Sequence, residues 1–261
     1  MTDITSTSNG KYKYIKSLLK KKGRAENGEY TVEGIKSVRD AVSAGVVRAV
    51  AVSESFYEDE CFDYADAEVY RVKDDIFAPL CDTQTPQGII GILPINESAA
   101  EFDKSKLYIY CDCVTDPGNA GTIIRTADAS GCGGVIFSKG CVDIYSPKTV
   151  RASMGSFFHT DIRSGADISV LEDMKRNGFN IICGALGENT VSYTSVDMTV
   201  PTVIVIGNEA NGVSGEVMDI CDACVKIPIY GQAESLNAGV AAAVIMYEAA
   251  RQRESVGKNK S

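Results

Sequence analysis

The 261-residue sequence contains a single histidine, His159, and this scarcity argues against several chemistries. A hydrolase of the Ser-His type needs a histidine beside its serine, and a structural zinc site usually needs several cysteines and histidines close together. The pair Cys221 and Cys224 forms a CxxC that no second such pair accompanies. We therefore interpret it as two ordinary half-buried cysteines rather than as a zinc or redox site. The nine cysteines, an odd number scattered through apolar segments, also do not resemble a secreted disulfide scaffold.

Long apolar runs are missing as well. No tract reaches the roughly 20 apolar residues that a membrane-spanning helix requires, and the longest candidate, Ala238–Ala250, predicts a buried helix. The N-terminal sequence MTDITSTSNG lacks the basic start and the apolar core of a signal peptide. We therefore expect a cytoplasmic protein without a membrane partner.

Basic residues are fewer than acidic ones, and the net charge of −9 argues weakly against a nucleic-acid partner. Their distribution is uneven, however. Seven basic residues and no acidic residue lie between positions 11 and 24, namely Lys11, Lys13, Lys16, Lys20, Lys21, Lys22 and Arg24. Such a run is either a solvated helix face or an RNA contact. The interleaved Tyr12 and Tyr14 suit stacking on bases, and they equally suit packing of the helix onto its domain.

Apolar strand-like runs alternate with helical patterns along the whole chain, which predicts an α/β fold. One series occupies residues 30–94, and a second starts at Leu107, after a polar, turn-rich stretch at 96–106. Five strand candidates of the second series (LYIYCDCV, GGVIFS, FNIICGAL, TVIVIG and CVKIPI) alternate with helices expected at 120–130, 169–177, 214–220 and 235–251. This predicts a mostly parallel sheet covered on both faces, with ligand loops after the strands. We place an N-terminal domain at 1–96 and a catalytic domain at 104–261.

Three glycine-containing loops follow strand candidates of the second series: Asp116–Ala127, Val205–Ser214 and Ile227–Ala241. Helices begin after the first two loops, and the free N–H groups of a helix N-terminus favour an anion. The alternative is purely structural, with Ser214 capping its helix and Arg125 exposed on the surface. The second loop has the glycine spacing of a P-loop, but Val213 stands where that motif requires lysine, and no loop carries G-x-G-x-x-G. A nucleotide-dependent enzyme is therefore disfavoured. Composition and periodicity alone reach only an α/β enzyme with glycine-rich ligand loops.

Taken together, the three loops resemble the motifs of the SpoU branch of the SPOUT RNA methyltransferases. The patterns N-x-G-x-x-x-R-[ST]-A, G-N-E-x-x-G and I-P-x-x-G-x-x-x-S-L-N are carried by Asn119, Gly121, Arg125, Thr126 and Ala127, by Gly207, Asn208, Glu209 and Gly212, and by Ile227, Pro228, Gly231, Ser235, Leu236 and Asn237. The intervening SPKTVRASMGSFF, from Ser146, is also typical, and the similarity spans Leu107 to Arg251. Residues 1–96, with VEG at Val32–Gly34, resemble the substrate-binding domain often fused ahead of this module, whose fold is similar to a small RNA-binding ribosomal protein.

The resemblance implies a parallel-sheet SPOUT domain whose C-terminal part forms a trefoil knot, a rare exception to the rule against threaded chains. It also implies S-adenosylmethionine as cofactor, no metal, and a homodimer with active sites near its interface. Carried over by position, the cofactor site would be lined by Gly207, Ile227 and Leu236, with Ile206, Ile229 and Ala185 as further candidates. The departure from the family pattern is Ala238-Gly239 after Ser-Leu-Asn, which puts the fine packing of the knot in doubt.

Arg125 corresponds to the arginine that the family uses for catalysis. A guanidinium, with a pKa above about 12, hardly deprotonates, so we favour clamping of an RNA phosphate and stabilisation of the developing 2′-alkoxide over general-base catalysis. By the same resemblance, Asn119 orients the ribose or Arg125, Glu209 holds the arginine in place, and Ser235 and Asn237 shape the site.

The sequence thus predicts an S-adenosylmethionine-dependent RNA methyltransferase that acts on a ribose 2′-hydroxyl, with a guanosine of large-subunit (23S) ribosomal RNA as the expected target. Transfer RNA is the alternative substrate. A second alternative is a non-catalytic RNA-binding or ribosome-assembly protein on the same fold, and the presence of both Arg125 and Asn119 disfavours it.

Overall fold

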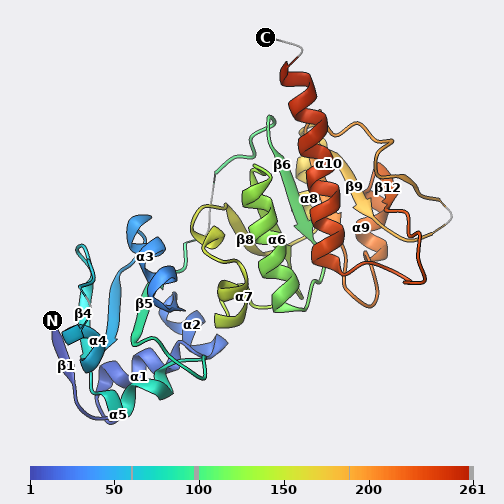
Figure 1. Ribbon diagram of the computed structural model, residues 1–261. Coiled ribbons are helices and arrows are strands. Elements are labelled where there is room, and N and C mark those ends of the chain that lie inside the picture. Colours follow the sequence, from blue (N-terminus) through green and yellow to red (C-terminus); the bar gives the residue numbers. More distant parts are fainter. Residues whose placement is uncertain (60, 97–99, 188, 259–261) are drawn as a thin grey trace. The chain divides into compact units, whose positions relative to one another are not determined.

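The computed structural model describes residues 1–59, 61–96, 100–187 and 189–258, and the chain forms two compact units (Figure 1). The first unit comprises Met1–Asn96 and Tyr145–His159, and the second comprises Glu97–Ile144 and Thr160–Ser261. The linker expected at 96–106 includes residues 97–99, which lie outside the described residues. Among the helices of the described residues, none is both long and apolar enough to span a membrane.

The first unit contains a five-stranded sheet in the order β1-β4-β3-β5-β2. Its strands are β1 (Thr2–Ile4), β2 (Glu29–Glu33), β3 (Ala49–Ser53), β4 (Glu68–Val72) and β5 (Ile89–Pro94). Strand β5 runs antiparallel to both of its neighbours, and the other pairs are parallel. Strands β2 to β5 lie in or at the start of the series expected at 30–94, and β1 precedes it.

Helices cover both faces of this sheet. Before the second unit begins they are α1 (Gly10–Ser17), α2 (Lys21–Asn27), α3 (Ile35–Ser43), α4 (Glu54–Asp59), α5 (Asp74–Phe77) and the 3₁₀ turn η1 (Ala78–Leu80). The apolar residues of α1 and its C-cap recur every third position, and Tyr12, Ile15 and Leu18 are buried against Tyr70 of β4. Val38 of α3 packs at Gly91 of β5, on the other face.

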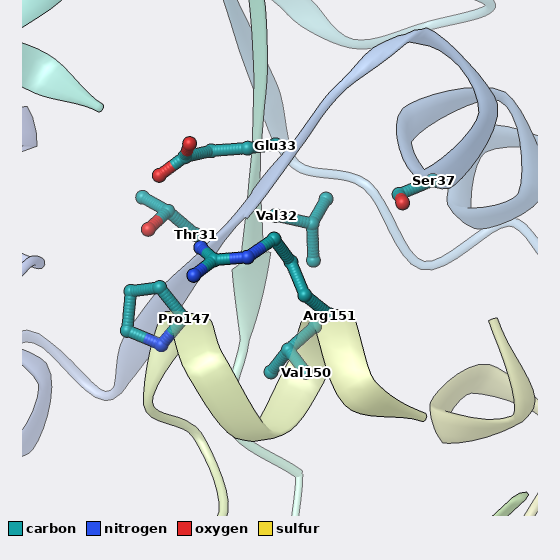
Figure 2. Close-up of a pocket in the computed structure, with 7 residues that line it drawn as sticks. All are labelled: Thr31, Val32, Glu33, Ser37, Pro147, Val150 and Arg151. Carbon is teal, nitrogen blue, oxygen red and sulfur yellow. The ribbon is translucent and has the colours of Figure 1, made fainter. Parts of the chain in front are cut away.

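A segment from the middle of the sequence completes the first unit. Helix α7 (Pro147–Ala152) packs on β2, and η2 (Ser156–Phe158) follows it. The ring of Tyr30 lies 5.1 Å from that of Tyr145 and 5.6 Å from that of Phe157. Figure 2 shows the pocket lined by residues of β2 and α7, into which the Arg151 guanidinium extends. Arg151 also pairs with Asp82 at 2.7 Å. Residues 145–159, which lie in the sequence between two stretches of the second unit, thus belong to the first unit.

The second unit is built on a seven-stranded sheet in the order β10-β12-β9-β11-β6-β7-β8, and every pairing in it is parallel. Its strands are β6 (Leu107–Cys111), β7 (Gly134–Ser138), β8 (Ile162–Ala166), β9 (Asn180–Gly184), β10 (Val191–Ser192), β11 (Thr202–Ile206) and β12 (Ala223–Lys226). Five of these strands were expected. Strands β8 and β10 were not, because IRSGA and the two-residue VS carry no apolar run.

Four helices pack against this sheet: α6 (Pro117–Ala129), α8 (Ser169–Arg176), α9 (Gly215–Ile220) and α10 (Ala238–Lys258). Helices α6 and α10 lie side by side (Figure 1). Leu171 and Met174 of α8 and Val217 of α9 join a buried cluster with the sheet residues Tyr110 and Val205. The predicted α/β fold with a parallel sheet is therefore confirmed.

Candidate functional site

A carboxylate from the second predicted loop holds the first loop in place. Glu209 Oε2 accepts hydrogen bonds from the backbone N–H (3.1 Å) and the hydroxyl (3.0 Å) of Thr115. Glu209 Oε1 accepts from the backbone N–H of Asp116 at 3.1 Å and from the side-chain amide of Asn119 at 2.8 Å. Four donors on one loop thus converge on one carboxylate, and this fixes the two loops against each other at the start of α6.

The third loop joins the same network through Asn237. Its side-chain nitrogen donates to Asn119 Oδ1 at 2.7 Å, and its own Oδ1 accepts from the backbone N–H of Val240, which caps α10. Asn119 is only 6% exposed, and its amide is engaged at both ends. All three predicted loops therefore meet in one chain of side-chain hydrogen bonds, from Glu209 through Asn119 to Asn237.

This network has an electrostatic consequence at Glu209. Desolvation opposes ionisation of the carboxyl group, but the hydrogen bonds from Asn119 and from backbone N–H groups, including those of Thr115 and Asp116, outweigh it and lower the pKa of Glu209 to about 2. The group is therefore a carboxylate at every physiological pH. Glu209 is therefore not a proton donor. It is a fixed anion that orders the loops.

The second loop is a closed turn with little room. Asn208 and Gly212 exchange backbone hydrogen bonds at 2.9 Å, and the Asn208 side-chain nitrogen donates to the carbonyl of Cys113 at 2.8 Å. A side chain at Gly207 would place its Cβ 2.2 Å from the backbone carbon of Gly212, so only glycine fits. Val213, which stands where a P-loop needs lysine, is buried. The loop is therefore shaped by its own backbone rather than for a nucleotide phosphate.

The six cofactor candidates gather at one edge of the sheet. Strands β12, β9 and β11 are neighbours and parallel, so their carboxyl ends lie together. The candidates at or after these ends are Ala185 after β9, Ile206 and Gly207 at the end of β11, and Ile227, Ile229 and Leu236 after β12. Ile206 is buried, Ile227 and Ile229 are half-buried, and Leu236 is 37% exposed. Exposed apolar groups among loop backbones fit an adenine ring, which needs an apolar face and N–H and C=O partners at its edge.

Two predicted catalytic residues stand apart from the network. Arg125 is exposed on α6, six residues after Asn119, and at about 100° per residue this puts it roughly 120° around the helix. Within the described part of the chain, no hydrogen bond or ion pair joins it to Glu209. The role expected for Glu209, holding the arginine, is therefore replaced by holding Asn119. Ser235 is exposed on the third loop.

The departure from the family pattern at Gly239 has a steric explanation. A Cβ at this position would lie 3.1 Å from the side chain of Thr122 on α6, closer than ordinary contact. The first turn of α10 therefore runs directly against α6, and the small residue permits this approach.

Ser214, which was expected to cap α9, stands at the N-cap, but its side chain makes no capping bond.

Sequence reasoning missed Thr115 and Asp112. Thr115 supplies two of the four donors to Glu209. Asp112 is buried, and its carboxylate accepts the backbone N–H of Ser214 at 2.7 Å, which ties β6 to the start of α9. An acidic residue inside the apolar run LYIYCDCV was the available signal for Asp112, because a buried carboxylate needs a partner. Thr115 carries no such signal.

The CxxC cysteines take no part in this site. Cys224 faces Cys183 on the neighbouring strand β9, with 3.1 Å between the sulfur atoms, and all nine cysteines are free thiols. The hydrogen bond with Cys183 and burial raise the pKa of Cys224 to about 11. A thiol that stays protonated at neutral pH is a poor nucleophile and metal ligand, in agreement with the interpretation as ordinary cysteines.

Comparison with known families and proteins agrees with this geometry. Residues 106–247 match the SpoU rRNA Methylase family, and residues 9–91 match the MRM3-like substrate binding domain. The first match includes helix α7, which packs in the first unit. Each of the three predicted loops lies inside the methylase match.

Full-length relatives share both parts. The chain is 34% identical to the 23S rRNA (guanosine(2553)-2′-O)-methyltransferase RlmP of Bacillus subtilis, over 95% of this chain and 98% of that protein. It is 32% identical to the 23S rRNA (uridine(2479)-2′-O)-methyltransferase of Streptomyces viridochromogenes, over 97% and 93% of the two chains. The crystal structure of the AdoMet-bound rRNA methyltransferase from Sinorhizobium meliloti superimposes with a TM-score of 0.85 at 31% identity, covering 96% of this chain and 97% of that one. The chain therefore belongs to the SpoU rRNA methylase family.

Proposed function

We propose that the protein transfers a methyl group from S-adenosylmethionine to the ribose 2′-hydroxyl of a guanosine in 23S ribosomal RNA, in the cytoplasm. The observation that carries the proposal is the hydrogen-bonded chain from Glu209 through Asn119 to Asn237, which brings the three loops typical of the SpoU family to one edge of the sheet. The full-length similarity to two 23S rRNA 2′-O-methyltransferases supports the substrate class.

S-adenosylmethionine, when bound, supplies a methyl group on a positively charged sulfur, and the apolar loops at the ends of β9, β11 and β12 suit its adenine. We propose Gly207, Ile227 and Leu236 as the residues that hold it, with Ile206, Ile229 and Ala185 beside them. The similar rRNA methyltransferase of Sinorhizobium meliloti binds AdoMet in its crystal structure, which supports this cofactor. The closed turn at Gly207 offers backbone groups in a fixed arrangement, so little order has to be gained on binding.

The polar residues then divide into two roles. Glu209, Asn119 and Asn237 engage one another, and we propose that they position the loops rather than the RNA. Arg125, which is exposed, is the residue that we propose contacts the RNA phosphate and stabilises negative charge developing on the 2′-oxygen. For Ser235, which is exposed on the third loop, we propose that it shapes the site. Rate enhancement then comes from positioning and charge stabilisation rather than from a general base.

We further propose that two copies associate and that the C-terminal segment is knotted, as the family resemblance implies. Exposed apolar side chains on α10 support a covered surface, because Val240 and Tyr247 are 47% and 54% exposed and lie seven residues apart on one face. Arg125 points away from the network of its own chain by the helical geometry, which supports a site completed near such an interface. Sedimentation equilibrium would give the mass of a dimer, and a monomer at micromolar concentration would contradict this part. The domain boundaries at 96 and 104 are likewise proposed.

The test of the function is site-resolved mapping of 2′-O-methyl groups on total RNA from wild-type, deletion and Arg125→Ala cells. Loss of one 23S site in both mutants supports the proposal and identifies the nucleotide, and the position equivalent to guanosine 2553 of the Bacillus subtilis relative is examined first. Loss of a uridine or of a transfer-RNA site would keep the chemistry and change the substrate. No loss in either mutant would favour a non-catalytic RNA-binding or ribosome-assembly protein.

A further inference from the structure

In the first unit, a basic stretch covers part of one face of the sheet and an acidic stretch covers part of the other. Alternate residues of β4 show which face is which, since Tyr70 packs with α1 while the next residue, Arg71, lies over the ring of Tyr57 in α4. Helix α1, which covers one face, lies in the basic stretch between Lys11 and Arg24, and this stretch contains no acidic residue. The opposite face is covered by α3 and by the segment that begins with α4.

The opposite face carries an acidic segment. Between Glu54 and Asp66 the sequence contains six acidic residues and no basic one. Of those described, Glu58, Asp63 and Asp66 are exposed. The aromatic ring of Phe62 anchors this segment to α3, because the guanidinium of Arg39 lies 5.7 Å from its centre. This segment therefore repels RNA phosphates.

The basic face presents an array of five exposed lysines: Lys13, Lys16, Lys20, Lys21 and Lys22. Within the described part of the chain, the only acidic group that pairs with any of them is Glu26, 3.7 Å from Lys22. Lys21 and Lys22 stand in the first turn of α2, where the helix dipole disfavours positive charge. Apart from the exposed pair of Lys22 with Glu26, their charge finds no partner in the fold, and an external anion would provide one.

The remaining members of the basic stretch hold the array rigid. Arg24 is only 4% exposed and donates to the carbonyl of Leu18 at 2.7 Å, which fixes the turn between α1 and α2. Lys11 donates to the hydroxyl of Tyr70 at 2.9 Å. The lysines are thus carried on a backbone that is already ordered, which lowers the cost of binding.

The tyrosines of the stretch are unavailable to bases. Tyr12 is only 2% exposed, in the core of the unit. The Tyr14 hydroxyl donates to Glu29 and accepts from Arg48, whose guanidinium lies 5.8 Å from the centre of the Tyr14 ring. Of the two alternatives for Tyr12 and Tyr14, stacking on bases or packing onto the domain, the structure shows packing. The exposed cationic groups that the basic stretch offers to RNA are therefore ammonium groups.

We propose that the lysine array of α1 and α2 is the surface on which this domain docks the RNA, and that it contacts backbone phosphates without reading bases. The inference rests on the proposed function, because it assumes that the substrate is RNA. Contacts of this kind position a nucleic acid and strengthen binding of any sequence equally, so selection of the methylated nucleotide must come from elsewhere. The acidic segment Glu54–Asp66, on the opposite face, disfavours binding there.

The test compares two quadruple variants of the full-length protein in binding to an unmodified 23S rRNA transcript at a series of salt concentrations. The array variant is K13Q/K16Q/K20Q/K21Q, and the control K36Q/K73Q/K104Q/K106Q removes the same charge elsewhere. Four lost phosphate contacts should lower the steepness of log K against log salt by about 3 and weaken binding about tenfold or more at low salt. The control should shift affinity far less and keep the slope. Equal behaviour of the two variants would overturn the proposal, with thermal melting confirming that both are folded.

Two further measurements separate this inference from the proposed function and test base reading. The array variant should raise KM for RNA and leave kcat at saturating RNA unchanged. If the wild type methylates no RNA, the proposed function fails while the binding comparison still decides the docking surface.

A photoreactive phenylalanine analogue at Ala25 should crosslink to RNA and one at Asp66 should not, and the reverse would overturn the orientation. A change of the methylated nucleotide in the array variant would contradict phosphate-only contact.

Discussion

The side-chain amide of Asn119 lies 2.8 Å from the carboxylate of Glu209, although 90 residues separate them in the chain. The contact joins the loop after β6 to the loop after β11, which are neighbouring parallel strands. Because Asn119 also accepts from Asn237, the carboxylate acts on the third loop through the amide. This relationship makes Glu209 a positioning residue whose removal should disturb two other loops.

The first prediction concerns Glu209→Gln. The substitution keeps the shape, but it replaces one acceptor oxygen by an N–H₂ group that faces donors from Thr115 or from Asp116 and Asn119. We expect a loss of about 1–3 kcal/mol in the free energy of unfolding, together with a fall in kcat/KM for methyl transfer. Chemical denaturation and a tritiated methyl-transfer assay measure the two effects.

Glu216→Gln is the matched control, because Glu216 is exposed in the first turn of α9. It should leave both quantities within about 0.5 kcal/mol of the wild type. A Glu209→Gln protein as stable and active as the control would show that the carboxylate does not order the loops.

The second prediction follows from the low pKa of Glu209. The folded-state pKa of about 2 lies below the ordinary value of 4.5, so the carboxylate stabilises the fold above pH 4.5 and this contribution disappears as pH falls toward 2. Solvent reaches Glu209, and screening limits the contribution to about 1 kcal/mol. The difference in unfolding free energy between wild type and Glu209→Gln should therefore be constant from pH 5 to 7 and shrink at lower pH. A difference that grows on acidification would contradict the assignment.

The sequence predicted the buried strands of the second unit well because each is a continuous run of β-branched and other apolar residues, as in TVIVIG at β11. It failed for β8, because Ile162 is the one large apolar residue in its sequence IRSGA and the strand pairs only with β7. Periodicity reports burial, so a half-exposed strand at the edge of a sheet leaves no such trace. The packing of α7 on β2 was equally invisible, because its partner lies more than 100 residues away in the chain.

The candidate site was predictable in part. Motif spacing brought Asn119, Glu209 and Asn237 to attention, and the structure joins them. Which atom bonds to which was not accessible, since Glu209 is held by backbone N–H groups, whose direction depends on the loop conformation. The proposed cofactor and catalytic assignments of Arg125 and the other motif residues stay predictions.

The third prediction tests the anchoring of α7 on the first unit. Arg151 Nη2 lies 2.7 Å from Asp82, whose backbone N–H donates to Glu33. A double-mutant cycle of Arg151→Ala and Asp82→Ala should give a coupling energy of about 0.5–1 kcal/mol, because both side chains are only partly buried. The same cycle with Lys139 and Asp167, an exposed pair at 2.6 Å, serves as the reference and should give less. No coupling between Arg151 and Asp82 would show that the pair does not hold the helix.

The fourth prediction concerns the turn at Gly207. In Gly207→Ala the new Cβ would overlap the backbone of Gly212 and Val213, at 2.2 and 2.3 Å, so the loop must open. We expect affinity for S-adenosylmethionine to fall about tenfold or more, since the backbone groups proposed to meet the cofactor move. Gly215→Ala is the matched control, because nothing lies within 4 Å of its added Cβ. Isothermal titration calorimetry of both variants measures the difference, and equal affinities would remove Gly207 from the proposed cofactor site.

The last prediction separates the two roles proposed for the polar residues. Arg125 is exposed and lies outside the network that orders the loops, so Arg125→Ala should leave the unfolding free energy within about 0.5 kcal/mol of the wild type. The methyl-transfer rate should nevertheless fall by about 10²–10³, because a cation that stabilises the developing 2′-oxygen charge is lost. Arg125→Lys should restore only part of the rate, since an ammonium cannot clamp a phosphate through two parallel hydrogen bonds. Arg176→Ala, on exposed α8, is the control and should change neither quantity. An Arg125→Ala rate equal to that of the wild type would assign the chemistry to another group. A variant that is as stable as the wild type but has lost its rate would show that the residue acts on the substrate rather than on the fold.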